Sequence, residues 1–190
     1  MMSDDVKFYT AKGDDGTTGL LGKGRVKKYH PRPAACGDVD EAQAALGVAR
    51  AAMLDPEAAA VVLQAQRDLY HLMAELAAEK DAAHRFRTID AARIEWLEQQ
   101  TDAFGARIDL PREFTVSGDS TAGAALDVAR TVVRRAERTV VRLYDEGYIE
   151  NPHLLAYLNR LSSLLFVLSR YEDAVGGQSA VRLAREDDSR

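Results

Sequence analysis

The feature that most constrains the fold of this chain is a set of long segments whose apolar residues recur every three to four positions, the period of an amphipathic helix. Two of these segments begin with strong signals, because Asp55-Pro56 and Asn151-Pro152 each place a capping side chain before a proline that suits the first helical turn. The pattern predicts helices over residues 33–53, 56–79, 89–105, 121–146 and 152–174. Short connections between helices favour antiparallel neighbours. We therefore expect an all-α fold, a five-helix bundle with the up-down packing of ferritin-like proteins.

The length of 190 residues suits one well-buried domain, which we expect to span residues 1–190. Within it, a glycine-rich N-terminal loop at 1–32 precedes the helical bundle at 33–175. The segment 176–190, which begins at Gly176-Gly177, is polar and mixed in charge, and we expect it to be a flexible tail.

The amino-acid composition argues against several classes of partner and of metal site. The 30 acidic and 25 basic residues give a net charge of -5, so we expect no nucleic-acid partner. No apolar run reaches the length needed to span a membrane, and the single cysteine, Cys36, excludes an intrachain disulfide and a cysteine cage for a metal. We expect a cytoplasmic protein without a membrane partner. The four histidines show no metal-ligand spacing, so no protein-bound metal site is expected: His30, His71, His84 and His153.

The N-terminal region carries five closely spaced glycines among donor and charged side chains: Gly13, Gly16, Gly19, Gly22 and Gly24. Glycines let backbone N–H groups approach phosphate oxygens closely, and lysines supply the opposite charge. The spacing matches neither a Walker A loop nor a dinucleotide fingerprint. The region is therefore either a phosphate-binding loop or a flexible arm.

The segment 126–138 combines an apolar helical stripe with several arginines. The stripe consists of Leu126, Ala129, Val133, Ala136, Val140 and Tyr144. Arg130, Arg134 and Glu137 flank it, whereas Arg135, Arg138 and Arg142 point further round. An arginine at a helix seam needs an anionic partner, because an unpaired buried charge is costly. The segment predicts either a small phosphorylated ligand or an intramolecular Arg-Glu lattice on a solvated face.

Three segments, in this order, carry a resemblance to a known family: residues 9–18 around Lys12-Gly13, residues 129–138 around Arg134-Arg135, and residues 157–162 around Asn159. The steps at 37–41 and at Glu113-Phe114 add to it. Together they resemble the PduO-type ATP:cob(I)alamin adenosyltransferases over about residues 8–171. The arginine segment is the most specific part of the match.

This resemblance implies transfer of the 5′-deoxyadenosyl group of ATP to cob(I)alamin with release of triphosphate. It also implies a homotrimer with active sites between subunits, and Mg²⁺ on the triphosphate. A flavoprotein reductant and an adenosylcobalamin-dependent mutase are the candidate partners. Arg130 resembles an arginine that pairs with an aspartate, here Asp40, across the subunit boundary, and Phe114 resembles the aromatic residue at the lower face of the corrin. The implied ATP contacts are Thr10, Lys12, Gly13, Asp14, Thr17, Thr18, Lys28, Arg134, Arg135, Glu137, Arg138 and Asn159.

Two departures and several alternatives accompany this interpretation. Ser117-Gly118-Asp119 stands where the family commonly has Pro-Gly-Gly, and Ser163 stands where an aspartate is usual. Taken without the resemblance, Phe114 is a core anchor, and Asn159, which shares a helical stripe with Ser163, Phe166 and Arg170, forms a seam hydrogen bond. At the level of function, the alternatives are a cobalamin carrier or ATP-sensing protein with little turnover, and a helical interaction module with a disordered arm.

Overall fold

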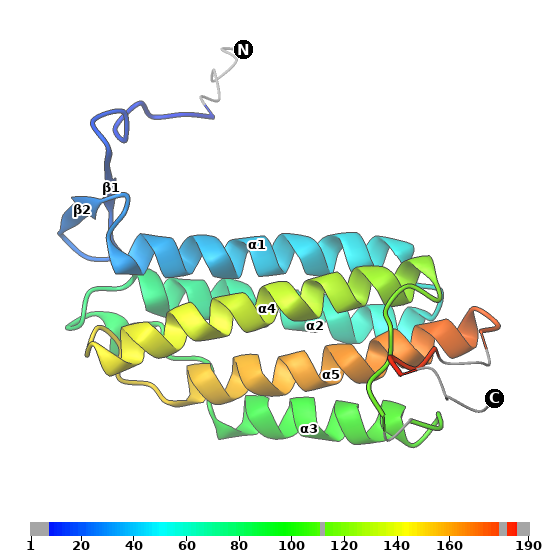
Figure 1. Cartoon of the computed structure of the whole chain (residues 1–190). Helices are drawn as coiled ribbons and strands as arrows, with labels where there is room; N and C mark the ends of the chain where they lie inside the picture. Colours follow the sequence, from blue (N-terminus) through cyan, green and yellow to red (C-terminus); the bar gives the residue numbers. More distant parts are fainter. Residues whose placement is uncertain (1–7, 111–112, 179–181, 186–190) are drawn as a thin grey trace, which may run out of the picture.

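The computed structural model describes residues 8–110, 113–178 and 182–185 and contains the five expected helices (Figure 1). They are α1 (Pro31–Ala52), α2 (Pro56–Ala77), α3 (Ala91–Gly105), α4 (Thr121–Asp145) and α5 (His153–Val175), and a short 3₁₀ turn, η1 (Ala83–Arg85), precedes α3. Each helix boundary lies within two residues of its expected position. The predicted all-α five-helix fold is confirmed.

Local chemistry sets the helix starts. The side chain of Asp55 accepts a hydrogen bond from the backbone N–H of Ala58 at 2.8 Å, and Ser120 does the same for Gly123 at 2.9 Å at the start of α4. Each cap satisfies an N–H group that has no partner inside its helix. The positions at which α2 and α4 begin are therefore fixed by side chains adjacent in sequence.

α4 occupies the centre of the arrangement, packed against α1 on one side and α5 on the other, while α2 packs on α1 and α3 covers α5 (Figure 1). The expected apolar stripe of α4 is buried from Leu126 to Val140, but Tyr144 is exposed near the helix end. Burial of such side chains supplies most of the stability of the bundle. Because α4 contacts both neighbours along its length, residues on the edge of its apolar stripe lie at helix seams.

The glycine-rich region is not wholly a loop, which corrects the sequence expectation. Strands β1 (Thr17–Gly19) and β2 (Arg25–Lys27) pair antiparallel, with Thr18 opposite Val26. The carboxylate of Glu79, just beyond α2, accepts hydrogen bonds from the backbone N–H groups of Lys23 at 3.1 Å and Gly24 at 2.7 Å. This contact holds the turn of the hairpin against the end of the bundle.

Glycines are required in that turn. Gly22 has a positive φ of 156°, and a Cβ atom at Gly22 would lie 2.1 Å from a Glu79 carboxylate oxygen. At Gly24 the corresponding distance is 2.2 Å. Because no side chain fits these spaces, the glycines here allow the backbone to approach a carboxylate rather than a phosphate.

The described part of the C-terminal segment, residues 182–185, makes backbone hydrogen bonds to the chain before α4. The backbone N–H of Val116 donates to the carbonyl of Arg182 at 2.8 Å, and that of Ala184 donates to the carbonyl of Phe114 at 2.7 Å. Residues 182–185 therefore pair with the link before α4 (residues 113–120), while the flexibility expected of the tail stays a prediction. Residues 179–181 and 186–190, like residues 1–7 of the predicted N-terminal loop, lie outside the described residues.

Two features are absent from the part of the chain that the structure describes. None of the helices has both the length and the apolar character needed to cross a membrane. No group of three or more histidine, cysteine, aspartate or glutamate side chains within these ranges could hold a metal ion.

Candidate functional site

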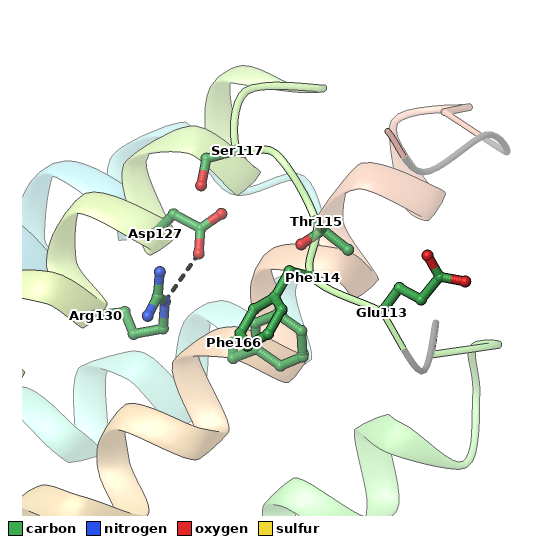
Figure 2. Close-up of a pocket in the computed structure, with 7 residues that line it drawn as sticks. All are labelled: Glu113, Phe114, Thr115, Ser117, Asp127, Arg130 and Phe166. Carbon is green, nitrogen blue, oxygen red and sulfur yellow. Dashed lines mark hydrogen bonds and ion pairs between the residues drawn. The ribbon is translucent and has the colours of Figure 1, made fainter. Parts of the chain in front are cut away.

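A cavity of about 330 Å³ opens where the link before α4 meets α4 and α5 (Figure 2). Its lining comes from three elements: Glu113, Phe114, Thr115 and Ser117 from the link, Asp127 and Arg130 from α4, and Phe166 from α5. The Phe114 side chain is 90% exposed, so it is a wall of this cavity and not the core anchor of the alternative interpretation. The same partly open cavity is therefore lined by the rings of Phe114 and Phe166 and by Arg130.

Arg130 is oriented by a carboxylate of its own helix. Its Nε atom donates to Asp127 Oδ1 at 3.0 Å (Figure 2), and the other oxygen of Asp127 accepts from Arg170 Nη2 at 2.8 Å. Asp40, the partner implied by the resemblance, is exposed on α1. Within one protomer the partner of Arg130 is therefore Asp127, a residue that the sequence analysis did not select.

A second cavity, of about 300 Å³, adjoins the first along the seam of α4 and α5. Arg130 and Phe166 line both cavities, and Arg134, Ser162 and Ser163 line only the second. The hydroxyl of Ser163, one of the two departures noted above, donates to the carbonyl of Asn159 at 3.4 Å. These two adjoining cavities are together called the groove; Phe114 lines only the first cavity and Arg134 only the second.

Other predicted residues lie along the same two helices. Asn159 Nδ2 donates to Glu137 Oε1 at 2.9 Å, which joins two of the expected ATP contacts across the α4–α5 seam. Arg138 lies one turn beyond Arg134 and donates to its carbonyl at 2.9 Å. The structure thus brings together four of the expected nucleotide contacts, with Arg134 and Arg138 both exposed.

The outermost arginines of α4 form surface ion pairs. Arg135 pairs with Glu41 of α1, and this hydrogen bond raises the pKa of Arg135 above its ordinary value. Arg142 Nε donates to Glu146 Oε1 at 2.6 Å. For these two residues the intramolecular lattice expected as an alternative is present, whereas Arg130 faces the cavity.

The remaining expected ATP contacts lie in or before the hairpin, in residues 10–28. Arg25, which the sequence analysis did not select, donates through Nη2 to the carbonyl of Lys12 and to Thr17 Oγ1, both at 2.7 Å. Asp15 accepts from Thr17 N at 2.8 Å, and the pKa of Asp15 is lowered mainly by its hydrogen bond with the Thr17 hydroxyl. The side chain of Lys28 lies against Gly13, where a Cβ atom would be 3.3 Å from Lys28 Nζ.

This arm, residues 10–28, projects from the end of the bundle where α1 begins, whereas the link that carries Phe114 lies at the opposite end (Figure 1). Arg134 and Arg138 lie between these ends, on α4. Among the described residues, the hydrogen bonds of the arm are made within residues 10–28, to His30 just before α1, and to residues 77–79 at the end of α2. The structure therefore assembles the arm and the groove as two separate halves.

Comparison with known proteins agrees with these features. The sequence model of the family described as cobalamin adenosyltransferase matches residues 8–172. A corrinoid adenosyltransferase from Mycobacterium tuberculosis is 42% identical over 177 residues, covering 90% of this chain and 91% of that protein. A cobalamin adenosyltransferase from Cupriavidus metallidurans is 38% identical over 185 residues, covering 96% and 97%.

A solved structure is also similar: a variant PduO-type ATP:corrinoid adenosyltransferase from Lactobacillus reuteri, complexed with cobalamin and ATP. It superposes with a TM-score of 0.87 at 30% identity and covers 95% of this chain and 97% of that one. The similarity in sequence and in structure therefore spans the arm, the helices and the groove.

Proposed function

Because this chain belongs to the cobalamin adenosyltransferase family, we propose that it is an enzyme that transfers the 5′-deoxyadenosyl group of ATP to cob(I)alamin. The products are adenosylcobalamin and triphosphate. The observation that carries the proposal is the groove between α4 and α5, which joins an aromatic cavity at Phe114 to a cationic one at Arg134. A corrin ring suits the first cavity, and a triphosphate suits the second.

The reaction requires the protein to position its two substrates and to stabilise the negative charge of the leaving group. The electron pair of cobalt(I) attacks C5′ of ATP, a cobalt–carbon bond forms, and the bond from C5′ to the triphosphate oxygen breaks. Cob(I)alamin is itself the nucleophile, so no side-chain base is needed. The protein must align C5′ with cobalt and stabilise the leaving triphosphate, tasks for which preorganised positioning contributes on the order of 7–11 kcal/mol.

We assign the triphosphate to cations of α4 and of the arm. Arg134 and Arg138 present guanidinium groups on the exposed side of α4, and Lys12 and Lys28 present ammonium groups on the arm. Arginine suits this task because its planar fork binds phosphate oxygens in pairs. We assign the binding of the nucleoside to Asn159 and Glu137, whose amide and carboxylate groups offer both donors and acceptors. Mg²⁺ would bind the triphosphate oxygens.

Phe114 and Phe166 are assigned to the corrin. An apolar wall beside the lower face of the ring would keep water and other ligands from cobalt, and a four-coordinate cob(II)alamin is easier to reduce. The 90% exposure of the Phe114 side chain leaves its ring available for such a contact.

A reductant, proposed to be a flavoprotein, would supply the electron, and an adenosylcobalamin-dependent mutase would take the product. Because the reaction needs ATP and a strong reductant, we propose that it takes place in the cytoplasm.

We also propose that the active site lies between subunits of a homotrimer. The arm projects from the end of the bundle where α1 begins (Figure 1), and in this proposal a second chain brings its groove to the lysines of that arm. The hydrogen bond of Arg130 within the described residues uses Nε, which leaves its two Nη groups for a further carboxylate. Asp40, exposed on α1 of a neighbouring subunit, would supply that carboxylate.

Anaerobic incubation of the purified protein with MgATP and cob(I)alamin tests the proposed reaction. Formation of a cobalt–carbon bond changes the absorption spectrum, and the expected result is many turnovers per subunit. A single turnover with product retained would favour the carrier alternative. If MgATP neither reacts nor raises the melting temperature, the proposal is wrong and the interaction-module alternative gains support.

A further inference from the structure

Arg170, on α5, is a buried arginine surrounded by three aspartates. Its side chain is 2% exposed, and those of Asp119, Asp127 and Asp173 are between 5% and 7% exposed. Arg170 Nη2 lies 2.8 Å from Asp127 Oδ2 and 3.1 Å from Asp173 Oδ2, and Nη1 lies 3.8 Å from Asp119 Oδ2. A cation buried this deeply is tolerated only with such partners.

Each aspartate belongs to a different part of the fold. Asp127 is in α4 and Asp173 is in α5, where its other oxygen accepts from the hydroxyl of Ser120 at 2.6 Å. Asp119 lies in the link that carries Phe114. Asp127 joins Arg170 of α5 to α4, and Asp119 joins the same arginine to the link.

Asp127 connects Arg170 to the aromatic cavity. One of its oxygens accepts from Arg170 and the other from Arg130, so the carboxylate plane is fixed from both sides. Asp127 and Arg130 both line the cavity (Figure 2). Loss of the Arg170 contact would let the carboxylate turn, and Arg130 would lose its fixed direction.

Asp119 connects Arg170 to the wall of the same cavity. It lies two positions after Ser117, which lines the cavity, and its second oxygen is 3.5 Å from Arg182 Nε of the C-terminal segment. That segment also bonds the backbone of Phe114 and Val116. Asp119 therefore joins this wall of the cavity to Arg170 and to the C-terminal segment.

The charges of this cluster balance only when its outer members are counted, because the Arg130 side chain is 28% exposed and that of Arg182 is 76% exposed. Three aspartates face Arg170, Arg130 and Arg182, and burial raises the pKa of Asp173 above its usual range. Among the described residues, Arg170 Nη1 and Asp173 Oδ2 have no hydrogen-bond partner. A change at any member therefore alters the electrostatic balance of the others.

We propose that Arg170 is a positioning residue of the corrinoid site, which directs Arg130 through Asp127 and holds the Phe114 link through Asp119. This inference rests on the proposed function. It predicts that defects in the group appear in corrinoid binding and reduction and leave ATP binding little changed.

The test compares Arg170→Lys, which keeps the charge but not the fork of donors, with Asp119→Asn, which keeps the shape of the side chain but not its charge. We expect kcat/KM for the corrinoid to fall about tenfold or more in both, with KM for ATP within about twofold of wild type. The spectrum of bound cob(II)alamin should lose part of its four-coordinate signal. The matched controls are Arg142→Lys and Asp102→Asn, at exposed positions on α4 and α3.

A purely structural role would lower the melting temperature of both variants and leave the corrinoid KM, kcat and the cob(II)alamin spectrum at wild-type values, which would overturn the inference. An equal loss for ATP and corrinoid would overturn it too. If Arg170→Lys does not fold, Asp119→Asn decides alone. A wild-type protein without transferase activity would instead defeat the proposed function, and this inference with it.

Discussion

At the residue scale, exposure separates side chains that act on a ligand from those that support the fold. Phe114 and Arg134 both line the groove while exposed to solvent, so neither contributes much to packing. Substituting an exposed side chain that lacks structural partners changes stability by only about 0.5 kcal/mol. Loss of activity at these two positions therefore reports on function and not on folding.

Phe114→Ala should keep ATP affinity and lose most turnover with cob(II)alamin and a reductant. We expect a loss of roughly 10- to 100-fold, because the apolar wall beside cobalt is removed while the cationic cavity is intact. Turnover under reducing conditions and ATP binding by calorimetry are the measurements, with Tyr70→Ala as an exposed aromatic control on α2. Turnover equal to wild type would remove Phe114 from the mechanism.

Arg134→Ala should lower kcat by about 100-fold or more, because a cation that stabilises developing charge on the leaving group is lost. Helical content should stay near wild type, since alanine is a good helix former. The control is Arg142→Ala two turns further along α4, where the arginine pairs with Glu146. Steady-state kinetics and circular dichroism check both points. Similar kinetics in the two variants would reject the role of Arg134.

Some site residues could be predicted from the sequence, whereas others depend on contacts that only the folded chain forms. The positions of Phe114 and Arg130 followed from the family resemblance, and both lie at the same cavity. Asp127 was missed although it precedes Arg130 by three positions, a spacing that makes helical neighbours. Attention to that spacing would have found it. Asp119 was noted as a departure, but its contact with Arg170 joins residues far apart in sequence.

At the element scale, helices were predictable because their signals are local. Periodicity and capping residues lie within each segment, so every boundary fell within two residues. The hairpin and the C-terminal pairing were not predictable in this way. Glu79 reaches Lys23 and Gly24 across 56 and 55 positions, and Leu183 pairs with Thr115. Such contacts appear only once the bundle brings distant segments together.

Glu79→Gln should loosen the hairpin and raise KM for ATP with little change in kcat. A carboxylate that accepts two backbone hydrogen bonds is exchanged for an amide that accepts them more weakly, a local loss of about 1–3 kcal/mol. Hydrogen exchange at the amides of Lys23 and Gly24 should speed up. The control is Glu57→Gln, which removes an exposed pair with Arg107. Unchanged exchange at both amides would show that Glu79 does not anchor the turn.

At the scale of the whole molecule, the arm and the groove are separate parts of one chain. The arm carries lysines at the end of the bundle where α1 begins, and the arginines of the groove lie along α4 (Figure 1). In a chain with a net charge of -5, both the arm and α4 therefore carry local clusters of basic side chains. The proposed triphosphate site takes donors from both clusters, so the two parts should act together across a subunit boundary.

Mixing two inactive variants tests this arrangement directly. Lys12→Ala damages the arm, and Arg134→Ala damages the groove, so each homo-oligomer should be inactive. If every site takes its arm from one chain and its groove from another, random mixed trimers in equal amounts have both halves intact at about one quarter of their sites. Co-expression of the two variants should therefore restore about one quarter of wild-type activity, with light scattering reporting a trimer. A site built within one chain would recover nothing, because each polypeptide carries a damaged half, and that result, or a monomeric protein, would contradict the shared site.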